Sequence, residues 1–245
     1  MQTPPASAAS SSVPHAGLSD VLGRAGGAVL AGVFGLMARA RGTRALHAVG
    51  FCGTGVLTVR PEGHSGVELL DDPGPHPCLV RWSRATGLRH GPDIEGLAVR
   101  LQGPAAGDVL LASTGTGLVT RHLLTVRSRH NHGPLTTLLP LSTERGPLLL
   151  RLDPARNVSA PTGEGEGQGT PPSAYRLLVS APGRPWHERG ALDITWTEHD
   201  CSRRHDPVGH PPVGSWTPPL WAHLRQPSYA ASQQVCADPE EPSRD

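Results

Sequence analysis

The sequence predicts an all-β core with flanking helices, arranged as a closed antiparallel barrel. Two observations lead to this fold class. First, the 245 residues include 30 glycines and 26 prolines, a composition that favours strands and loops over long helices. Second, short apolar stretches follow one another along the chain, separated mostly by turn residues and without helices between them. Many short strands in series are typical of a closed antiparallel barrel.

The strand stretches can be placed by their apolar residues and by the turns between them. Two of them read as a hairpin, because the cluster 103–107 (GPAAG) separates them by five residues. The region 118–142 is ambiguous and fits a helix followed by a loop. The predicted strands are 45–51, 54–59, 66–70, 78–83, 96–102, 108–113, 147–152, 175–180 and 191–197.

Helices are expected on both sides of the strand series. Apolar residues recur at helical spacing from 18 to 40, and a second helix is expected from about 218 to 235. The predicted organisation is a disordered N-terminus (1–15), one barrel domain (16–236) and a disordered tail (237–245). Within the domain, 161–173 is a low-complexity loop.

Composition excludes several functions. The formal net charge is +1, which argues against nucleic acid and anionic membranes as partners. All 22 cationic residues are arginine, so Schiff-base and phosphate-loop lysine chemistry are absent.

The same composition bears on the compartment. The four cysteines are far apart, which predicts reduced thiols. The apolar run 25–37 is too short for a membrane span and lacks the setting of a secretion signal. A cytoplasmic protein is expected.

Three short motifs give the main functional signal. They are Arg44-Ala-Leu-His47-Ala-Val-Gly50, Val80-Arg81-Trp82-Ser83 and Arg225-Gln-Pro-Ser-Tyr229. In order and chemistry they resemble the haem pocket of catalases, which carry R-x-x-H-A-x-G, V-R-F-S and R-x-F-S-Y. The resemblance covers about residues 40–115 and 217–235, and it implies a catalase-like barrel that binds haem b.

The resemblance also implies a role for each matched residue. His47 matches the distal acid–base group, and an imidazole can take a proton from one peroxide oxygen and return it to the other. Ser83 matches the residue that orients this histidine. Tyr229 matches the iron ligand, and Arg225 lies one helical turn earlier, where a cation favours the phenolate. The remaining matches, Arg44 and Arg81, are expected to hold the propionates.

Several positions depart from the catalase pattern. Ala112 stands where the family has an asparagine that assists the distal histidine, and Glu95 stands where it has an arginine. Pro227 replaces a phenylalanine and is expected to kink the helix that presents Tyr229. These differences predict a peroxidase or hydroperoxide-transforming enzyme with weak catalase activity. Its expected partner is a peroxide or an organic hydroperoxide, with a homo-oligomer as one expected assembly.

Two alternatives stay open. A degenerate catalase-like barrel without catalysis would bind a partner or an apolar ligand, and loss of the distal asparagine favours this. A metal-dependent phosphodiesterase would use two His-Asp doublets as ligands for divalent metal. These doublets are His199-Asp200 and His205-Asp206.

Overall fold

The computed structural model describes residues 50–85, 91–128, 131–155, 171–199 and 205–217. The chain divides into two units, Met1–Gly42 and Thr43–Asp245, and all of the described residues lie in the second. The domain bounds expected from sequence stay a prediction. In the described part of the chain, no helix has the length and apolar character needed to cross a bilayer.

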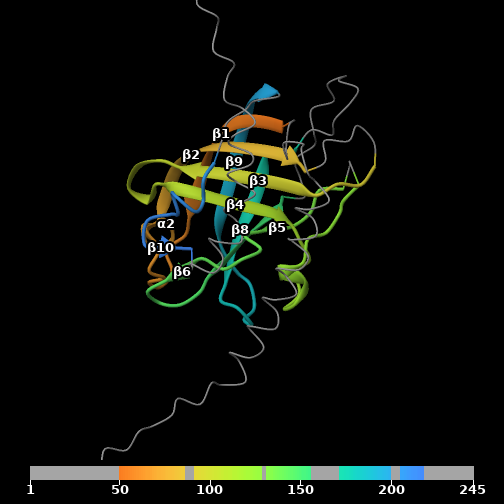
Figure 1. Cartoon of the computed structure of the whole chain (residues 1–245). Helices are drawn as coiled ribbons and strands as arrows, with labels where there is room; N and C mark the ends of the chain where they lie inside the picture. The colour runs from red at the N-terminus through yellow and green to blue at the C-terminus, as the bar shows by residue number, and fades with distance from the viewer. Residues whose placement is uncertain (1–49, 86–90, 129–130, 156–170, 200–204, 218–245) are drawn as a thin grey trace, which may run out of the picture. The chain divides into compact units, whose positions relative to one another are not determined.

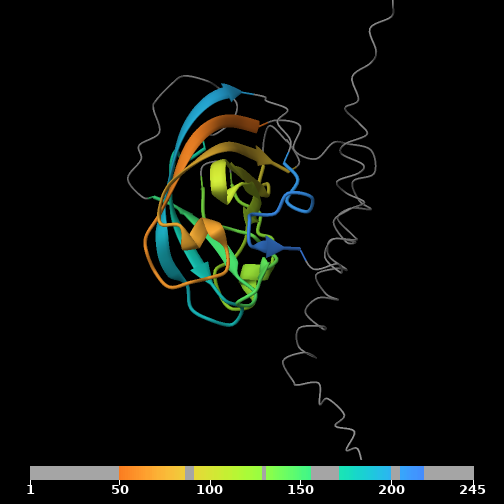
Figure 2. The ribbon, with the colours of Figure 1, turned by 90° about the vertical axis from the view of Figure 1, so that its left-hand side faces the viewer.

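Eight antiparallel strands form a closed barrel, as the sequence predicted (Figure 1). Each strand pairs with the next in the order β1-β2-β3-β4-β5-β7-β8-β9, and β9 pairs with β1 to close the sheet. Figure 2 shows the strands curving around a common interior. The strands are β1 (Gly50–Val59), β2 (Gly74–Arg84), β3 (Glu95–Leu101), β4 (Gly107–Ser113), β5 (Leu135–Thr136), β7 (Leu149–Pro154), β8 (Ala174–Ser180) and β9 (His187–His199).

The interior of the barrel is filled with side chains that alternate along each strand. Leu97, Val99 and Leu101 of β3 are buried, whereas the residues between them are only partly buried. Val80 and Trp82 follow the same alternation on β2. Complete burial of each such side chain stabilises the fold by about 1.5–3 kcal/mol. The period of two therefore assigns every residue of these strands to the inner or the outer face.

The hairpin predicted across 103–107 is confirmed. β3 pairs with β4 in register, with Leu101 opposite Gly107, and the connection contains a single turn of 3-10 helix, η1 (Gly103–Ala105). Gly103 has φ 76°, a left-handed conformation that glycine adopts without a steric penalty. The turn residues therefore specify this connection as the sequence suggested.

Two predictions in the strand series are wrong. The break expected between residues 51 and 54 is absent, because β1 runs from Gly50 to Val59. Residues 66–70 were expected to be extended, but Glu68–Asp71 form a short helix, α2. The carboxylate of Asp71 accepts hydrogen bonds from the backbone amides of Ser65 and Gly66, at 2.6 and 2.8 Å. These bonds fold the chain back on itself, so that the adjacent Leu69 and Leu70 are both buried. A strand would have placed them on opposite faces.

The region 118–142, ambiguous in sequence, contains little regular structure. It includes a turn of 3-10 helix, η2 (Thr120–His122), and the two-residue strand β5. At its end, β6 (Ser142–Thr143) pairs with β10 (Ser215–Trp216) in a small second sheet. The helices expected at 18–40 and 218–235 lie outside the described residues.

Candidate functional site

The outer face of strands β1 to β4 carries a row of small residues. Ser83 pairs with Gly50 on one side and with Gly96 on the other, and Gly96 pairs with Ala112. All four face outwards, because the residues next to them along the strands point into the core. We call this row, together with the adjacent row Cys52, Arg81, Ala98 and Leu110, the outer platform.

Arg81 is the cation of the outer platform. A Cβ atom added at Gly50 would lie 3.4 Å from Cζ of Arg81, so the guanidinium lies over the start of β1. Burial lowers the pKa of Arg81 from its ordinary value, but an arginine remains charged at neutral pH. Position 50 requires glycine for another reason, because an added Cβ would clash with the carbonyl oxygen of Trp82.

The structure brings together the predicted site residues that it describes. Ser83 and Arg81 lie on the same face, and Ala112 lies in the same row as Ser83, two strands away. Ser83 is buried and Arg81 is half-buried. The other predicted residues, His47, Arg44, Arg225 and Tyr229, lie outside the described residues.

The outer platform also contains a disulfide. Cys52 is disulfide-bonded, to a partner outside the described residues. The expectation of reduced thiols is therefore wrong for Cys52 and right for Cys78, which is free and buried. The predicted cytoplasmic location stays a prediction.

Directly behind the platform, the barrel interior holds a close pair of polar side chains. Glu95 on β3 faces inwards, and its carboxylate lies 2.8 Å from Nδ1 of His132. The ring of His132 packs edge-on against Trp82, with 6.0 Å between the ring centroids. Burial, and to a lesser extent the charge of Glu95, raise the pKa of Tyr175 above its ordinary value, so this phenol stays protonated.

Sequence reasoning did not find the pair of Glu95 and His132. The available signal was the alternation of β3, which places Glu95 in phase with the buried Leu97, Val99 and Leu101. A carboxylate at an inward position needs a partner, because burying an unpaired charge is costly. Which of the thirteen histidines supplies that partner depends on the path of the loop before β5.

A strap formed by residues 205–217 crosses the edge of β4. The backbone amide of Asp206 donates to Oδ2 of Asp108 at 2.6 Å, and the amide of Asp108 donates to the carbonyl of His210. Arg100 binds the same carboxylate through two bonds of 2.7 Å. Although burial opposes ionisation, the bonds from Arg100 and Asp206 lower the pKa of Asp108. Asp108 therefore fixes the strap to the outer surface as a carboxylate.

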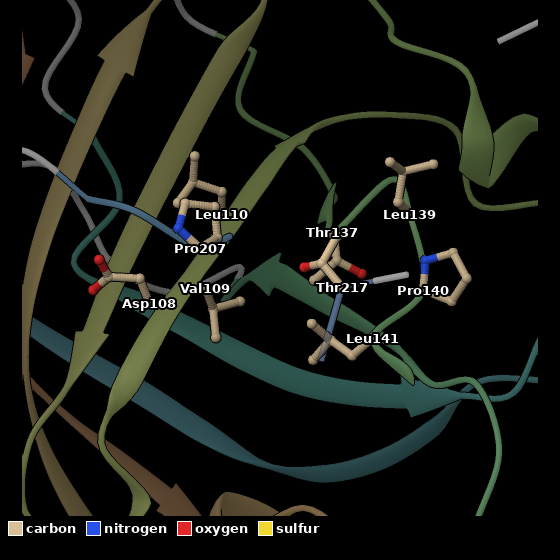
Figure 3. Close-up of a pocket in the computed structure, with 9 residues that line it drawn as sticks. All are labelled: Asp108, Val109, Leu110, Thr137, Leu139, Pro140, Leu141, Pro207 and Thr217. Atoms are coloured by element: carbon tan, nitrogen blue, oxygen red, sulfur yellow. The ribbon is translucent and has the colours of Figure 1, made fainter. Parts of the chain in front are cut away.

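A small pocket lies between the strap, β4 and the loop after β5 (Figure 3). Leu110 belongs both to this pocket and to the outer platform, so the two are continuous. Leu138 lies between the pocket residues Thr137 and Leu139 in the chain. It has φ 60°, a left-handed conformation that is uncommon for a leucine. The lining is mostly apolar and consists of Asp108, Val109, Leu110, Thr137, Leu139, Pro140, Leu141, Pro207 and Thr217.

Two of the four residues predicted as metal ligands, His205 and Asp206, are described with their side chains. They give the metal-centre alternative no support. Oδ1 of Asp206 accepts bonds from the amides of Val208 and Gly209, so this carboxylate caps a turn. Within the described ranges, no group of three or more acidic, histidine or cysteine side chains is placed to hold a metal ion. Asp200 lies outside those ranges, and the side chain of His199 is not among those described.

The outer platform is made of small residues with one cation among them. Gly50, Gly96 and Ala98 carry little or no side chain, and the half-buried Arg81 supplies the charge. No protein-family model matches the chain, and a search of curated proteins finds no match.

Proposed function

We propose that this chain is a haem protein of the catalase-related type, which reduces hydrogen peroxide or an organic hydroperoxide. The observation that carries the proposal is the row Gly50, Ser83, Gly96 and Ala112 on one outer face. Two of the three motifs of the resemblance end on this row, at Gly50 and Ser83, and Ala112, which stands at the family's asparagine position, lies on it as well. Four consecutive strands thus contribute to one surface.

The register supports a distal pocket at Ser83. His47 precedes Gly50 by three residues, which span at most about 11 Å of chain. Since Gly50 lies directly opposite Ser83, the imidazole of His47 is within reach of the Ser83 hydroxyl. A hydroxyl bonded to one ring nitrogen would fix the tautomer and leave the other nitrogen for peroxide.

The path of the strap supports a proximal ligand on the same face. Thr217 lines the pocket beside Leu110, so the chain reaches the edge of the outer platform at that point. Tyr229 follows twelve residues later, about 18 Å along the axis if that segment is helical. The distance from β4 to β1 is about 14 Å, three strand spacings. Tyr229 can therefore reach the centre of the platform.

In this proposal each residue has one task. Bound haem would supply the redox chemistry of peroxide cleavage. His47 moves the proton between the peroxide oxygens, and Ser83 orients His47. Tyr229 would hold the iron as a phenolate, with Arg225 favouring loss of its proton. Arg44 and Arg81 would bind the propionates.

Ala112 sets the expected balance of activities. A methyl group at this point of the row offers peroxide no hydrogen bond, and loss of one such group typically costs about two orders of magnitude in rate. Dismutation requires a second peroxide to be held in the same place. Oxidation of an organic donor does not, so we propose that peroxidase or hydroperoxide-transforming activity exceeds dismutation.

The test is absorption of protein produced with ample haem. We expect a Soret band in the wild type that is lost in Tyr229→Phe, because a phenyl ring offers iron no ligand. Tyr175→Phe is the matched control, since the chain has two tyrosines and Tyr175 is buried inside the barrel. His47→Ala should keep the band and lose turnover.

A colourless wild type would overturn the proposal. The chain would then be a barrel without haem that binds an apolar ligand or a partner. Full haem binding by Tyr229→Phe with an unchanged spectrum would instead refute the proximal ligand. Metal analysis of the same preparation tests the phosphodiesterase alternative.

A further inference from the structure

Four large aliphatic side chains are exposed within nine residues around η2. Leu118 is 59% exposed, Val119 72%, Leu123 40% and Val126 65%. They stand on the connection that leaves β4, where a globular protein usually places polar residues. We call these four residues the apolar tip. Large exposed apolar patches on soluble proteins mark interaction sites, whereas single exposed aliphatic residues need no explanation.

The apolar tip is built on an anchored turn. Arg121 lies beneath it, almost completely buried, and donates bonds of 3.1 Å to the carbonyl of Gly117, the hydroxyl of Ser180 and the carbonyl of Arg184. Its guanidinium also lies 4.7 Å from the ring centroid of Trp186. These contacts tie the tip to the turn between β8 and β9. The aliphatic side chains are therefore presented on a fixed support.

Three arginines lie beside the tip, and of these Arg184 alone is exposed. Arg121 has no carboxylate partner among the described residues, and Arg151 shares the Trp186 ring with it at 5.5 Å. The nearby carboxylate is Asp153, which binds Arg151 at 2.6 Å. Arg184 is exposed and makes no ion pair in the described part of the chain. The sequence from 109 to 143 contains no Asp or Glu at all.

We propose that the apolar tip docks on the surface of an anionic lipid bilayer, with Leu118 and Val119 inserted between the lipids. Binding at a bilayer surface grows with the apolar area inserted and with attraction to anionic headgroups, and the tip provides both. Protein interfaces are dominated instead by Trp, Tyr and Arg anchors, and the tip has no aromatic residue. The formal net charge of +1 is a sum over the whole chain, so it does not reveal the local charge at the tip.

The test is co-sedimentation of the full chain with vesicles of phosphatidylcholine and phosphatidylglycerol, compared with phosphatidylcholine alone. We expect binding to the anionic vesicles and a loss of about tenfold or more in affinity for Leu118→Ser/Val119→Ser. The matched control is Val56→Ser/Val213→Ser, which changes two exposed aliphatic residues elsewhere and should bind as the wild type does. Circular dichroism would establish that both double variants are folded.

Charge is tested separately. Arg184→Gln should weaken binding to the anionic vesicles several-fold at low salt and much less at high salt. Unchanged binding by Leu118→Ser/Val119→Ser would overturn the proposal, even if another apolar stretch such as 25–37 holds the chain on the vesicle. Wild-type self-association that this variant abolishes, without vesicle binding, would assign the tip to a protein interface instead. None of these outcomes depends on haem.

Discussion

The carboxylate of Glu95 accepts a hydrogen bond from Nδ1 of His132 at 2.8 Å, inside the end of the barrel. Glu95 stands between Ile94 and Gly96, and Gly96 is part of the outer platform. The pair therefore lies on the inner side of the same strand that forms the candidate site. The inner side of β3 therefore carries a buried acidic residue directly beneath the outer platform.

The first prediction concerns His132→Ala. Removing the imidazole leaves a buried carboxylate without this partner, and we expect a loss of about 1–3 kcal/mol in the free energy of unfolding. His64→Ala is the control, because His64 forms an ion pair with Asp71 but is mostly exposed. Exposed pairs contribute little, so its effect should stay below about 1 kcal/mol. Urea unfolding measures both.

A double-mutant cycle sharpens this test. Glu95→Gln removes the charge and keeps the shape of the side chain. If the pair interacts directly, Glu95→Gln/His132→Ala should cost less than the sum of the single variants. Additive effects would show that Glu95 and His132 stabilise the barrel independently.

The second prediction concerns acid and the carboxylate that holds the strap. The pKa of Asp108 is lower in the folded chain than the value of about 3.9 in an unfolded one. Its contribution is therefore complete above the unfolded value and is lost as the pH falls through the folded value. Asp108→Asn should be about 1–2 kcal/mol less stable at pH 7, and this difference should shrink below about pH 4.

The control for Asp108 is a carboxylate outside any such network. Asp193 on β9 is exposed and makes no ion pair among the described residues. Asp193→Asn should change stability by less than about 0.5 kcal/mol at either pH. A difference between wild type and Asp108→Asn that stays constant from pH 7 to pH 2 would contradict the assigned ionisation.

The third prediction concerns thiol reactivity. Burial raises the pKa of the Cys78 thiol to about 12, so little thiolate is present near neutral pH. Cys78 should be unreactive towards a thiol reagent in the native chain and reactive in denaturant. Reduction should release Cys52 as well and lower stability by about 2–5 kcal/mol. Peptide mapping of the unreduced chain, compared with Cys52→Ser, would identify the partner of Cys52.

Much of the barrel was predictable because its strands alternate cleanly. β3 and β4 were placed within one residue at each end, since Leu97, Val99 and Leu101 keep a period of two and the hairpin turn is marked by glycine and proline. By contrast, β5 and β10 have two residues each, too few for a period to be seen. Their pairing depends on contacts that are distant in sequence.

The candidate site also contains residues that the sequence could predict and residues that it could not. Ser83 and Arg81 could be selected because a strand motif carries them, and the register then placed them on one face. The positions of Asp108 and His132 depend on the strap and on the loop before β5, whose paths no local pattern specifies. Local periodicity thus predicts which residues share a face, and tertiary contacts decide what covers that face.

The last prediction concerns Ala112→Asn. Ala112 lies two strands from Ser83 in the same row, and both residues face outwards. An asparagine at position 112 would therefore place its amide on the same outer face as Ser83. If the proposed function is right, this amide offers peroxide the hydrogen bond that the wild type lacks. We expect oxygen release to rise by about tenfold or more relative to oxidation of an organic donor. Ala98→Asn, one row away, should leave this ratio unchanged. An equal gain from both variants would show that added polarity, and not the position of the amide, determines the balance.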